Sequence, residues 1–238
     1  MTSTMAHERF APCWVRLAGF NLLLIMMVVS AVSDPLLEAE LIRQVSAEYG
    51  TPAANAVARW QRLMQEQSKE DSLITLKAVN TFFNSIPNVS DADHWGRDNY
   101  WATPVELLAT NGGDCEDFAI AKYFTLKVLG IAESKLRITY VRAYSRGNGG
   151  LKIIPHMVLA YYPMADAEPL ILDNIVEDIR PASQRKDLVP TFGFNGEGLW
   201  YAKARGSGHR LGGIEGMPLW QDLLTRMGRS MQAGRKVR

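Results

Sequence analysis

The chain has 238 residues, of which 47% are apolar and 21% are charged. Such a composition is typical of a globular protein with a substantial core, and it excludes a disordered or fibrous chain. The formal net charge of +1 gives no reason to expect a nucleic acid or an anionic membrane surface as the partner.

The N-terminus carries a short apolar run, Leu17 to Val32, that follows basic residues and ends in small ones. Its 16 residues fall short of the roughly 20 that a membrane-spanning helix needs. Residues 31–33, Ala-Val-Ser, place small side chains at the positions that a signal peptidase reads. We therefore predict a signal peptide over residues 1–33 and a single exported domain over residues 34–238. An uncleaved membrane anchor is the alternative.

Cleavage after residue 33 would change both the charge and the cysteine count. It takes two basic residues and one acidic residue from totals of 26 and 25, which leaves 24 of each sign and a net charge of zero. It also removes Cys13, so Cys115 is then alone and no internal disulfide can form. An unpaired cysteine in an exported protein is an intermolecular bridge, a buried bystander or a reactive group.

Helical periodicity dominates the first half of the mature chain. Apolar residues recur every three or four positions in three segments, residues 34–50, 52–70 and 70–87. A polar stretch follows, and Thr103, Pro104 and Glu106 then form a capping box that predicts the start of a short helix. A longer helix is predicted over residues 116–129, with Gly130 as its C-terminal stop.

After residue 130 the pattern changes to the alternation typical of strands. Three strands are predicted, over residues 136–144, 153–162 and 169–174. The first two are joined by a short turn-rich connection, which favours antiparallel pairing. A further strand within residues 194–208 and a short helix over residues 217–227 complete the pattern. Helices followed by a meander predict one α+β domain.

Cys115 is the first candidate for chemistry. It lies at a predicted helix start, where free backbone N–H groups and the positive end of the helix dipole favour a thiolate. Three acids surround it, Asp114, Glu116 and Asp117, and nearby negative charge has the opposite effect on a thiol. The stretch therefore combines a position that favours a nucleophile with neighbours that suppress one.

A thiol nucleophile needs a base and a group that orients the base. His156, within a predicted strand, and Asp173, at the end of the next one, supply these two residue types. Each of the three residues also has an ordinary interpretation: an inert buried cysteine, a core or surface histidine, and a turn-forming aspartate. Their combination in one chain favours a catalytic triad.

Around these residues the sequence resembles a known family. The stretch "GDCEDFAIAKYFTLKVLG", with "YWATPVELL" before it and "PHMVLAYY" and "LILDN" after it, is similar to the bacterial transglutaminase-like cysteine proteinases, specifically those of the LapG type. The resemblance covers the chain from about Trp60 to Tyr201. It implies a papain-like or transglutaminase-like core with a Cys-His-Asp triad at Cys115, His156 and Asp173.

The resemblance also implies a function, a cofactor and partners. Proteases of this type are periplasmic and calcium-dependent, and they cleave large biofilm adhesins near the N-terminus at a dialanine-containing site, which releases the adhesin from the cell surface. An inner-membrane receptor for cyclic di-GMP holds them inactive. We therefore expect an adhesin as the substrate and that receptor as the inhibitor. Separately, the neutral charge of the mature chain argues for no nucleic-acid partner, and we expect a monomeric enzyme.

Calcium would explain the three acids beside the thiol. Ca²⁺ takes roughly six to eight oxygen ligands, and a bound dication would reverse the local field. With the resemblance, we predict Asp114, Glu116 and Asp117 as ligands, and Asp98 or backbone carbonyls as further ones. The alternative is that acids at this position only cap the helix.

Two other functions stay open from the sequence. The same triad could transfer an acyl group to an amine, as a transglutaminase does, or cleave a peptidoglycan amide. Alternatively, the groove could serve as a non-catalytic binding module in which Cys115 is inert. The four histidines of the chain show no ligand spacing such as HExxH, which argues against a histidine-based metalloenzyme.

Overall fold

The computed structural model of the protein describes residues 35–147, 150–202 and 208–233. The chain divides into two units, Met1–Ser33 and Asp34–Arg238. The predicted signal peptide coincides with the first unit and lies outside the described residues, so it stays a prediction. Within the described residues, no helix is long and apolar enough to cross a membrane.

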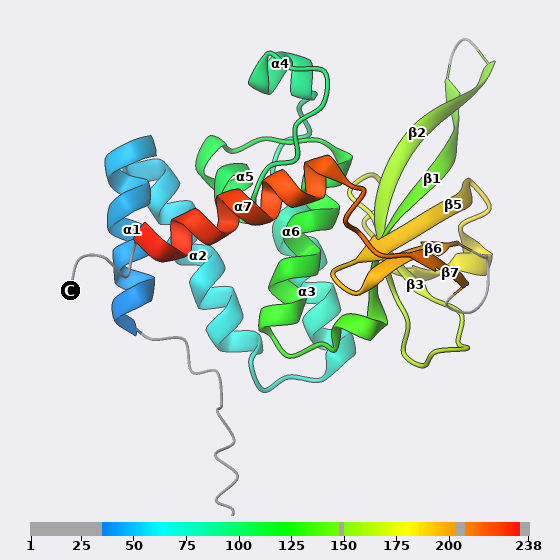
Figure 1. The fold of residues 1–238 in the computed structure, drawn as a ribbon, viewed down its shortest axis with the longest axis horizontal. Coiled ribbons are helices and arrows are strands. Elements are labelled where there is room, and N and C mark those ends of the chain that lie inside the picture. Colours follow the sequence, from blue (N-terminus) through cyan, green and yellow to red (C-terminus); the bar gives the residue numbers. More distant parts are fainter. Residues whose placement is uncertain (1–34, 148–149, 203–207, 234–238) are drawn as a thin grey trace, which may run out of the picture. The chain divides into compact units, whose positions relative to one another are not determined.

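Helices form the first half of the second unit and return at its end (Figure 1). The predicted capping box is present, because the Thr103 hydroxyl accepts the N–H of Glu106 and the Glu106 carboxylate accepts the N–H of Thr103. The indole N–H of Trp60 donates to the Thr125 hydroxyl at 2.9 Å, which joins the second helix to the sixth. The described helices are α1 (Pro35–Tyr49), α2 (Thr51–Gln67), α3 (Ser72–Asn84), α4 (Asp91–Trp95), α5 (Pro104–Thr110), α6 (Cys115–Val128) and α7 (Pro218–Ala233).

The strands form one sheet in the order β4-β3-β2-β1-β5-β6-β7, and all neighbouring pairs are antiparallel. Two short 3-10 helices, Glu133–Lys135 and Ala182–Gln184, precede β1 and follow β4. Helices followed by an antiparallel sheet confirm the predicted α+β class. The described strands are β1 (Leu136–Gly147), β2 (Gly150–Tyr161), β3 (Leu170–Leu172), β4 (Arg180–Pro181), β5 (Leu188–Asn195), β6 (Gly198–Tyr201) and β7 (His209–Gly212).

The strand β5 was not predicted, although it lies in the middle of the sheet. Its sequence contains Pro190 and Gly193, which both weaken a strand pattern. The register between β1 and β5 shifts between Tyr140 and Val141, so that Thr191 is the extra residue of a bulge and Pro190 lies beside it. Gly193 permits a close approach, because a Cβ there would lie 3.0 Å from the Thr139 hydroxyl.

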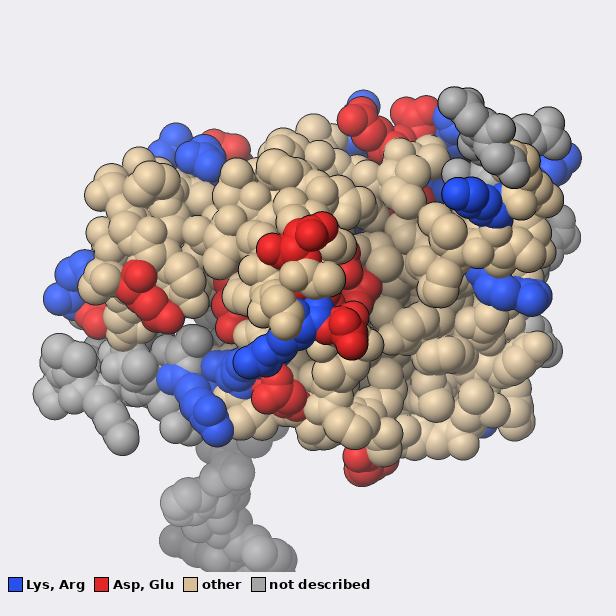
Figure 2. Space-filling model, turned by 90° about the horizontal axis from the view of Figure 1, so that it is seen from above, with Lys and Arg blue, Asp and Glu red and all other residues tan. Residues whose placement is uncertain are grey.

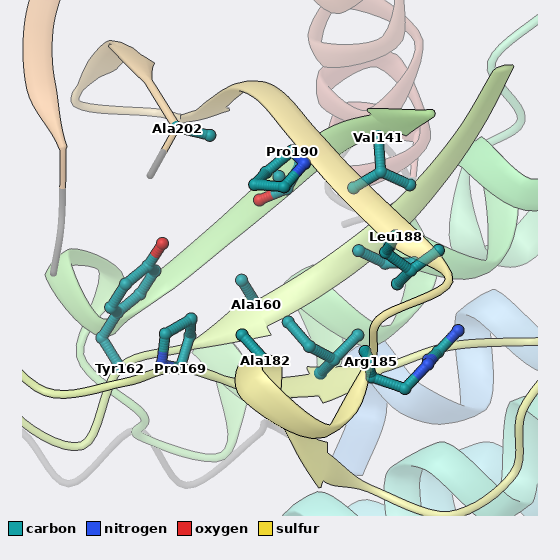
Figure 3. A pocket seen from close by; sticks show the side chains of 12 residues that line it. Val141, Ala160, Tyr162, Pro169, Ala182, Arg185, Leu188, Pro190 and Ala202 are labelled. Atoms are coloured by element: carbon teal, nitrogen blue, oxygen red, sulfur yellow. The ribbon is translucent and has the colours of Figure 1, made fainter. Parts of the chain in front are cut away.

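Buried apolar side chains form a large and a small cluster on opposite faces of the sheet. Residues alternate along β2, so Met157 and Leu159 belong to the large core with α6, whereas Val158 and Ala160 belong to the small cluster. The small cluster borders a cavity of about 50 Å³, which has room for one or two water molecules (Figure 3). The helix-facing side of β2 is therefore where α6 meets the sheet.

The last helix completes the large core. Trp220 of α7 is 1% exposed, and its ring stacks on Phe124 of α6 with centroids 5.5 Å apart and meets Phe194 of β5 at 5.3 Å. Two turns later, Arg226 donates to the main-chain oxygen of Trp101. The helix α7 thus joins α6, the sheet and the segment before α5.

Replacing Trp220 should show how much of the stability depends on this contact. Trp220→Ala leaves a cavity in the large core, so we expect a loss of about 3–5 kcal/mol in the free energy of unfolding, measured by urea denaturation. Trp220→Phe should lose less, because it keeps an aromatic ring. Leu224→Ala on the same helix, at a position 36% exposed, is the control. Equal stability of the two alanine variants would contradict the prediction.

Candidate active site

Cys115 is the first residue of α6, and Asp114 is the N-cap. The thiol donates to the Glu116 carboxylate, with 3.1 Å between Sγ and Oε2, and it accepts the backbone N–H of Met157 in β2. Burial raises the pKa of the Cys115 thiol, and the negative charge of Glu116 adds to the effect. Without a compensating positive charge, the thiol is therefore protonated at neutral pH.

His156 and Asp173 form a buried pair, and they are 4% and 1% exposed. The Nε2 atom of His156 lies 2.8 Å from Oδ1 of Asp173. Burial alone would raise the pKa of Asp173, but hydrogen bonds from His156, the Ile175 N–H and Arg185 hold it at about 2. Asp173 is therefore ionised and able to orient the imidazole through Nε2. The other ring nitrogen, Nδ1, then remains to accept a proton from a thiol.

Arg185 is a second partner of Asp173, and the sequence alone does not identify it. Its Nη2 atom lies 2.7 Å from Oδ2 of Asp173 and 2.7 Å from Oδ2 of Asp187. Figure 3 shows Arg185 at the edge of the small cavity. Nothing in the local sequence "QRKDL" distinguishes this buried cation from the adjacent Lys186, so only the fold reveals it.

Two asparagine side chains of α3 hold the backbone that follows β3. The side-chain amide of Asn84 donates to the carbonyl oxygen of Asp173, and that of Asn80 donates to the carbonyl oxygen of Glu177, both at 2.8 Å. Asp173 is therefore held through its main chain by a helix and through its side chain by Arg185.

Of the predicted triad, the structure brings His156 and Asp173 into direct contact. It places Cys115 beside Met157, the residue that follows His156 in β2. The hydrogen bond that the thiol donates goes to Glu116. Cys115 is thus located against the strand of the base, and its action with His156 and Asp173 stays a prediction.

Lys122 is a buried cation on the same helix as Cys115. It is 1% exposed, and its Nζ atom lies 6.0 Å from the centre of the Phe118 ring. Desolvation lowers the pKa of Lys122 to about 7, and the charge of Asp173 partly counteracts this. A lysine this deeply buried is uncommon, and it makes the environment of Asp173 more positive.

Asp91, Asp114 and Asp117 form an acid cluster, in which one carboxylate oxygen from each lies within 4.8 Å of the others. Asp117 is fully buried and accepts the N–H of Ala102 at 2.7 Å and the N–H of Asp114 at 3.2 Å. Asp91 begins α4, and Figure 2 shows acidic side chains gathered near the middle of the face that carries this helix. Asp98, considered from the sequence, is exposed and lies outside the cluster.

The acid cluster has the properties of a site for a hard divalent cation. One oxygen each of Asp91 and Asp114 is buried without a hydrogen-bond partner among the described residues. Burial raises the pKa of Asp117 to about 8, and burial with the charge of Glu116 raises the pKa of Asp114 to about 9. Buried carboxylates with unused oxygens need a proton or a cation, and oxygen ligands of this kind fit Ca²⁺.

The predicted ligands differ in how they relate to this cluster. Asp114 and Asp117 belong to it, and Asp91 was missed because it lies far away in the sequence. Glu116 forms a second group with Asp114 and Cys115, so its role as a ligand stays a prediction. The acids do cap the helix as well, since Asp117 accepts the N–H of the N-cap residue.

Gly113 makes room for the buried carboxylate. A Cβ at this position would lie 2.6 Å from Oδ2 of Asp117 and 2.7 Å from Cδ1 of Leu107. Such distances are too short for any side chain, so the glycine before the N-cap is required by the close approach of Asp117.

The sequence profile of the bacterial transglutaminase-like cysteine proteinases, BTLCP, matches residues 50–187. This segment is more than half of the chain, and it contains Cys115, His156 and Asp173. The chain belongs to this family. Among curated protein sequences, none matches this proteinase.

Solved structures of LapG from Legionella pneumophila resemble the proteinase. Calcium-bound LapG is 39% identical with a TM-score of 0.65, and the match covers 79% of this chain and 98% of LapG. EGTA-treated LapG is 37% identical with a TM-score of 0.66, and a third LapG structure is 37% identical with a TM-score of 0.67; each match covers 80% of this chain and 97% of LapG. The proteinase is therefore of the LapG type and has a transglutaminase-like core.

The raised pKa values predict how pH acts on the metal-free proteinase. Asp114 and Asp117 bind protons more tightly in the folded chain than in the unfolded chain, where such carboxyls titrate near 3.8. The stability that these protons give is complete below about pH 4 and is lost as the pH rises toward 8 and 9. In EGTA, we expect the melting temperature to fall by about 5 °C or more between about pH 4 and pH 7, measured by calorimetry.

Two variants and calcium serve as controls for this pH effect. Asp114→Asn should remove part of the fall, whereas Asp98→Asn, at an exposed acid outside the cluster, should not. Lys122 contributes little to the change in stability between about pH 4 and pH 7, because its pKa in the folded protein, about 7, lies at the upper end of that pH range. Added calcium should raise the melting temperature most at the higher pH. A melting temperature that stays constant or increases with pH in EGTA would refute the effect.

Replacing Arg185 tests the support of Asp173. Arg185→Ala breaks a buried ion pair, so we expect a loss of about 3–5 kcal/mol in the free energy of unfolding, and Arg185→Lys should recover part of it because the charge is kept. Arg180→Ala removes a largely exposed pair with Asp178 and should cost less than about 1 kcal/mol. Urea denaturation of the three variants measures the difference, and equal losses for the two alanine variants would disprove it.

Proposed function

We propose that the protein is a calcium-dependent cysteine endopeptidase of the periplasm. It cleaves the N-terminal region of a large biofilm adhesin at a dialanine-type site, and the cut releases the adhesin from the cell surface. The observation that carries the proposal is the position of Cys115, at the start of a helix, against the strand of His156 and beside a buried acid cluster. Identity of 37–39% to LapG, over 79–80% of this chain, supports the same class of reaction.

The proposed chemistry uses the three residues in two steps. Cys115 attacks the scissile carbonyl while His156 takes the thiol proton at Nδ1 and passes it to the leaving amine, so the peptide bond breaks and a thioester forms on Sγ. Water, deprotonated by His156, then hydrolyses the thioester and regenerates the thiol. Asp173 holds the imidazole with its other proton on Nε2.

The helix start supplies a group for the oxyanion of the tetrahedral intermediate. The first N–H groups of a helix have no partner within the helix, and that of Cys115 is one of them. A donor at this position is close to the attacked carbonyl, because it belongs to the nucleophile itself. The second donor stays open between groups of the preceding loop.

The acid cluster gives a physical reason for dependence on calcium. Asp91, Asp114 and Asp117 would hold the ion, and Glu116 would add a ligand on the side of Cys115. Bound calcium supplies positive charge, which lowers the cost of a thiolate beside these acids. The ligands from α4 and α6 would then fix the two segments against each other.

Regulation and assembly complete the proposal. We infer that an inner-membrane receptor for cyclic di-GMP is the inhibitor and that the enzyme acts as a monomer. The receptor follows only from the resemblance to proteases of the LapG type, and the monomeric state is proposed without further support. Export by the N-terminal segment would bring enzyme, receptor and adhesin into the same compartment.

Cleavage of a defined substrate tests the proposal directly. The protein is incubated with the N-terminal segment of a large surface adhesin from the same cell, and the fragments are identified by mass spectrometry. We expect a single cut at a dialanine site in calcium, a loss of about 100-fold or more in EGTA, and no cut by Cys115→Ala. His156→Ala should lower the rate by about 100-fold or more, as expected on loss of a general base.

Three results would oppose the proposal in different ways. Incorporation of a primary amine without chain cleavage would assign a transglutaminase. Slow iodoacetamide labelling of Cys115 in calcium, unchanged by His156→Ala, would assign a non-catalytic binding module. Equal rates in EGTA and calcium would remove the metal from the function.

A further inference from the structure

The strand that meets Cys115 has an open edge. β2 pairs with β1 along its whole length, but β3 covers its other edge only at residues 159–161. Over residues 151–157, no other described strand or loop bonds to the backbone on that side. Cys115 lies where this open edge ends, because its sulfur accepts the N–H of Met157.

Alternation along β2 shows which residues face the open edge. Tyr162, just beyond β2, donates its N–H to the Lys135 carbonyl on the β1 side, so the even-numbered residues bond to β1 and the odd-numbered residues point away. Two further observations agree with this assignment. The N–H of Met157 goes to Cys115, and Pro155, which has no N–H, falls on the side where no ladder bond is lost.

The open edge combines free main-chain groups with exposed apolar side chains. It presents the N–H and C=O groups of Leu151 and Ile153 and the C=O of Pro155. Their side chains share a face with Met157, and Leu151 and Ile153 are 61% and 55% exposed. Figure 1 shows β1 and β2 extending beyond the neighbouring strands in this region. Residues 151–157 of β2, called the arm below, therefore form an apolar strand edge that runs from solvent to the Cys115 thiol.

An open apolar edge is a hazard for a protein that has no use for it, because it can pair with other chains. Here Pro155 limits continuous pairing, and Lys152 adds a charge on the opposite face of the arm. One extended polypeptide still fits the edge. Its main chain can bond to Leu151 and Ile153 with little regard to sequence, and every second side chain can contact the apolar stripe.

We propose that the substrate chain binds to residues 151–155 of β2 as an added β-strand, with apolar side chains at alternate positions toward Leu151 and Ile153. This inference rests on the proposed function, in which Cys115 is the nucleophile. The arm from Leu151 to Met157 spans about 20 Å at the rise of a strand, so it holds about six substrate residues to one side of the scissile bond. The substrate is thus an extended segment, and a helical segment must unfold to be cut.

Substitutions on the two faces of the arm test this mode of binding. Ile153→Asp places a charge on the apolar stripe, and Lys152→Asp places the same residue on the opposite face. Ile153→Pro removes an N–H from the open edge and leaves the bonds to β1 in place. With the adhesin segment as substrate, we expect Ile153→Asp and Ile153→Pro to lower kcat/KM by about 10-fold or more, mainly through KM, and Lys152→Asp to change it by less than about 2-fold.

Labelling of Cys115 with iodoacetamide separates this inference from the proposed function. All three variants should label at the wild-type rate and keep the wild-type melting temperature, since positions 152 and 153 are at least four residues from Met157, where β2 meets Cys115. If kcat/KM is unchanged in Ile153→Asp and Ile153→Pro, the added strand is wrong but the proposed protease function stands. The same conclusion follows if Lys152→Asp lowers kcat/KM as much as the two Ile153 variants do. A wild-type protein that neither cleaves the segment nor labels rapidly would overturn both.

Discussion

A single buried carboxylate, that of Asp117, fixes the start of α6 against the segment that precedes α5. It accepts the main-chain N–H of Ala102, before α5, and that of Asp114, at the start of α6, so two segments of the chain converge on one side chain. Gly113 leaves the space that this side chain occupies. Because a buried negative charge is costly without a counter-charge, the same residue that positions Cys115 also makes the site favour a cation.

The catalytic candidates come from two layers, the helices and the sheet. The helix α6 brings Cys115, and the sheet brings His156 and Asp173. Asp173 has its own supports, since Arg185 neutralises its carboxylate and Asn84 holds its carbonyl. A movement of α6 relative to the sheet would therefore change the position of Cys115 relative to His156 at β2. Apolar packing of the large core opposes such a movement.

The sequence predicted features whose causes are local. The capping box at Thr103, the helix after Asp114 and the first two strands follow from spacing and turn chemistry, and the family resemblance supplied the proposed triad. Asp91 and Arg185 were not predicted, because each acquires its role only through partners distant in the chain. The strand β5 was missed because Pro190 weakens its pattern, and only the bulge against β1 explains how it is tolerated.

The place of α7 in the large core has a consequence for the order of events during synthesis. Residues 115–173 leave the ribosome well before Trp220, whose ring completes the packing around Phe124 and Phe194. Arg226, still later, binds the main chain just before the α5 cap. A nascent chain thus carries Cys115 without the complete core that positions it, and the full site forms only when the last helix is available.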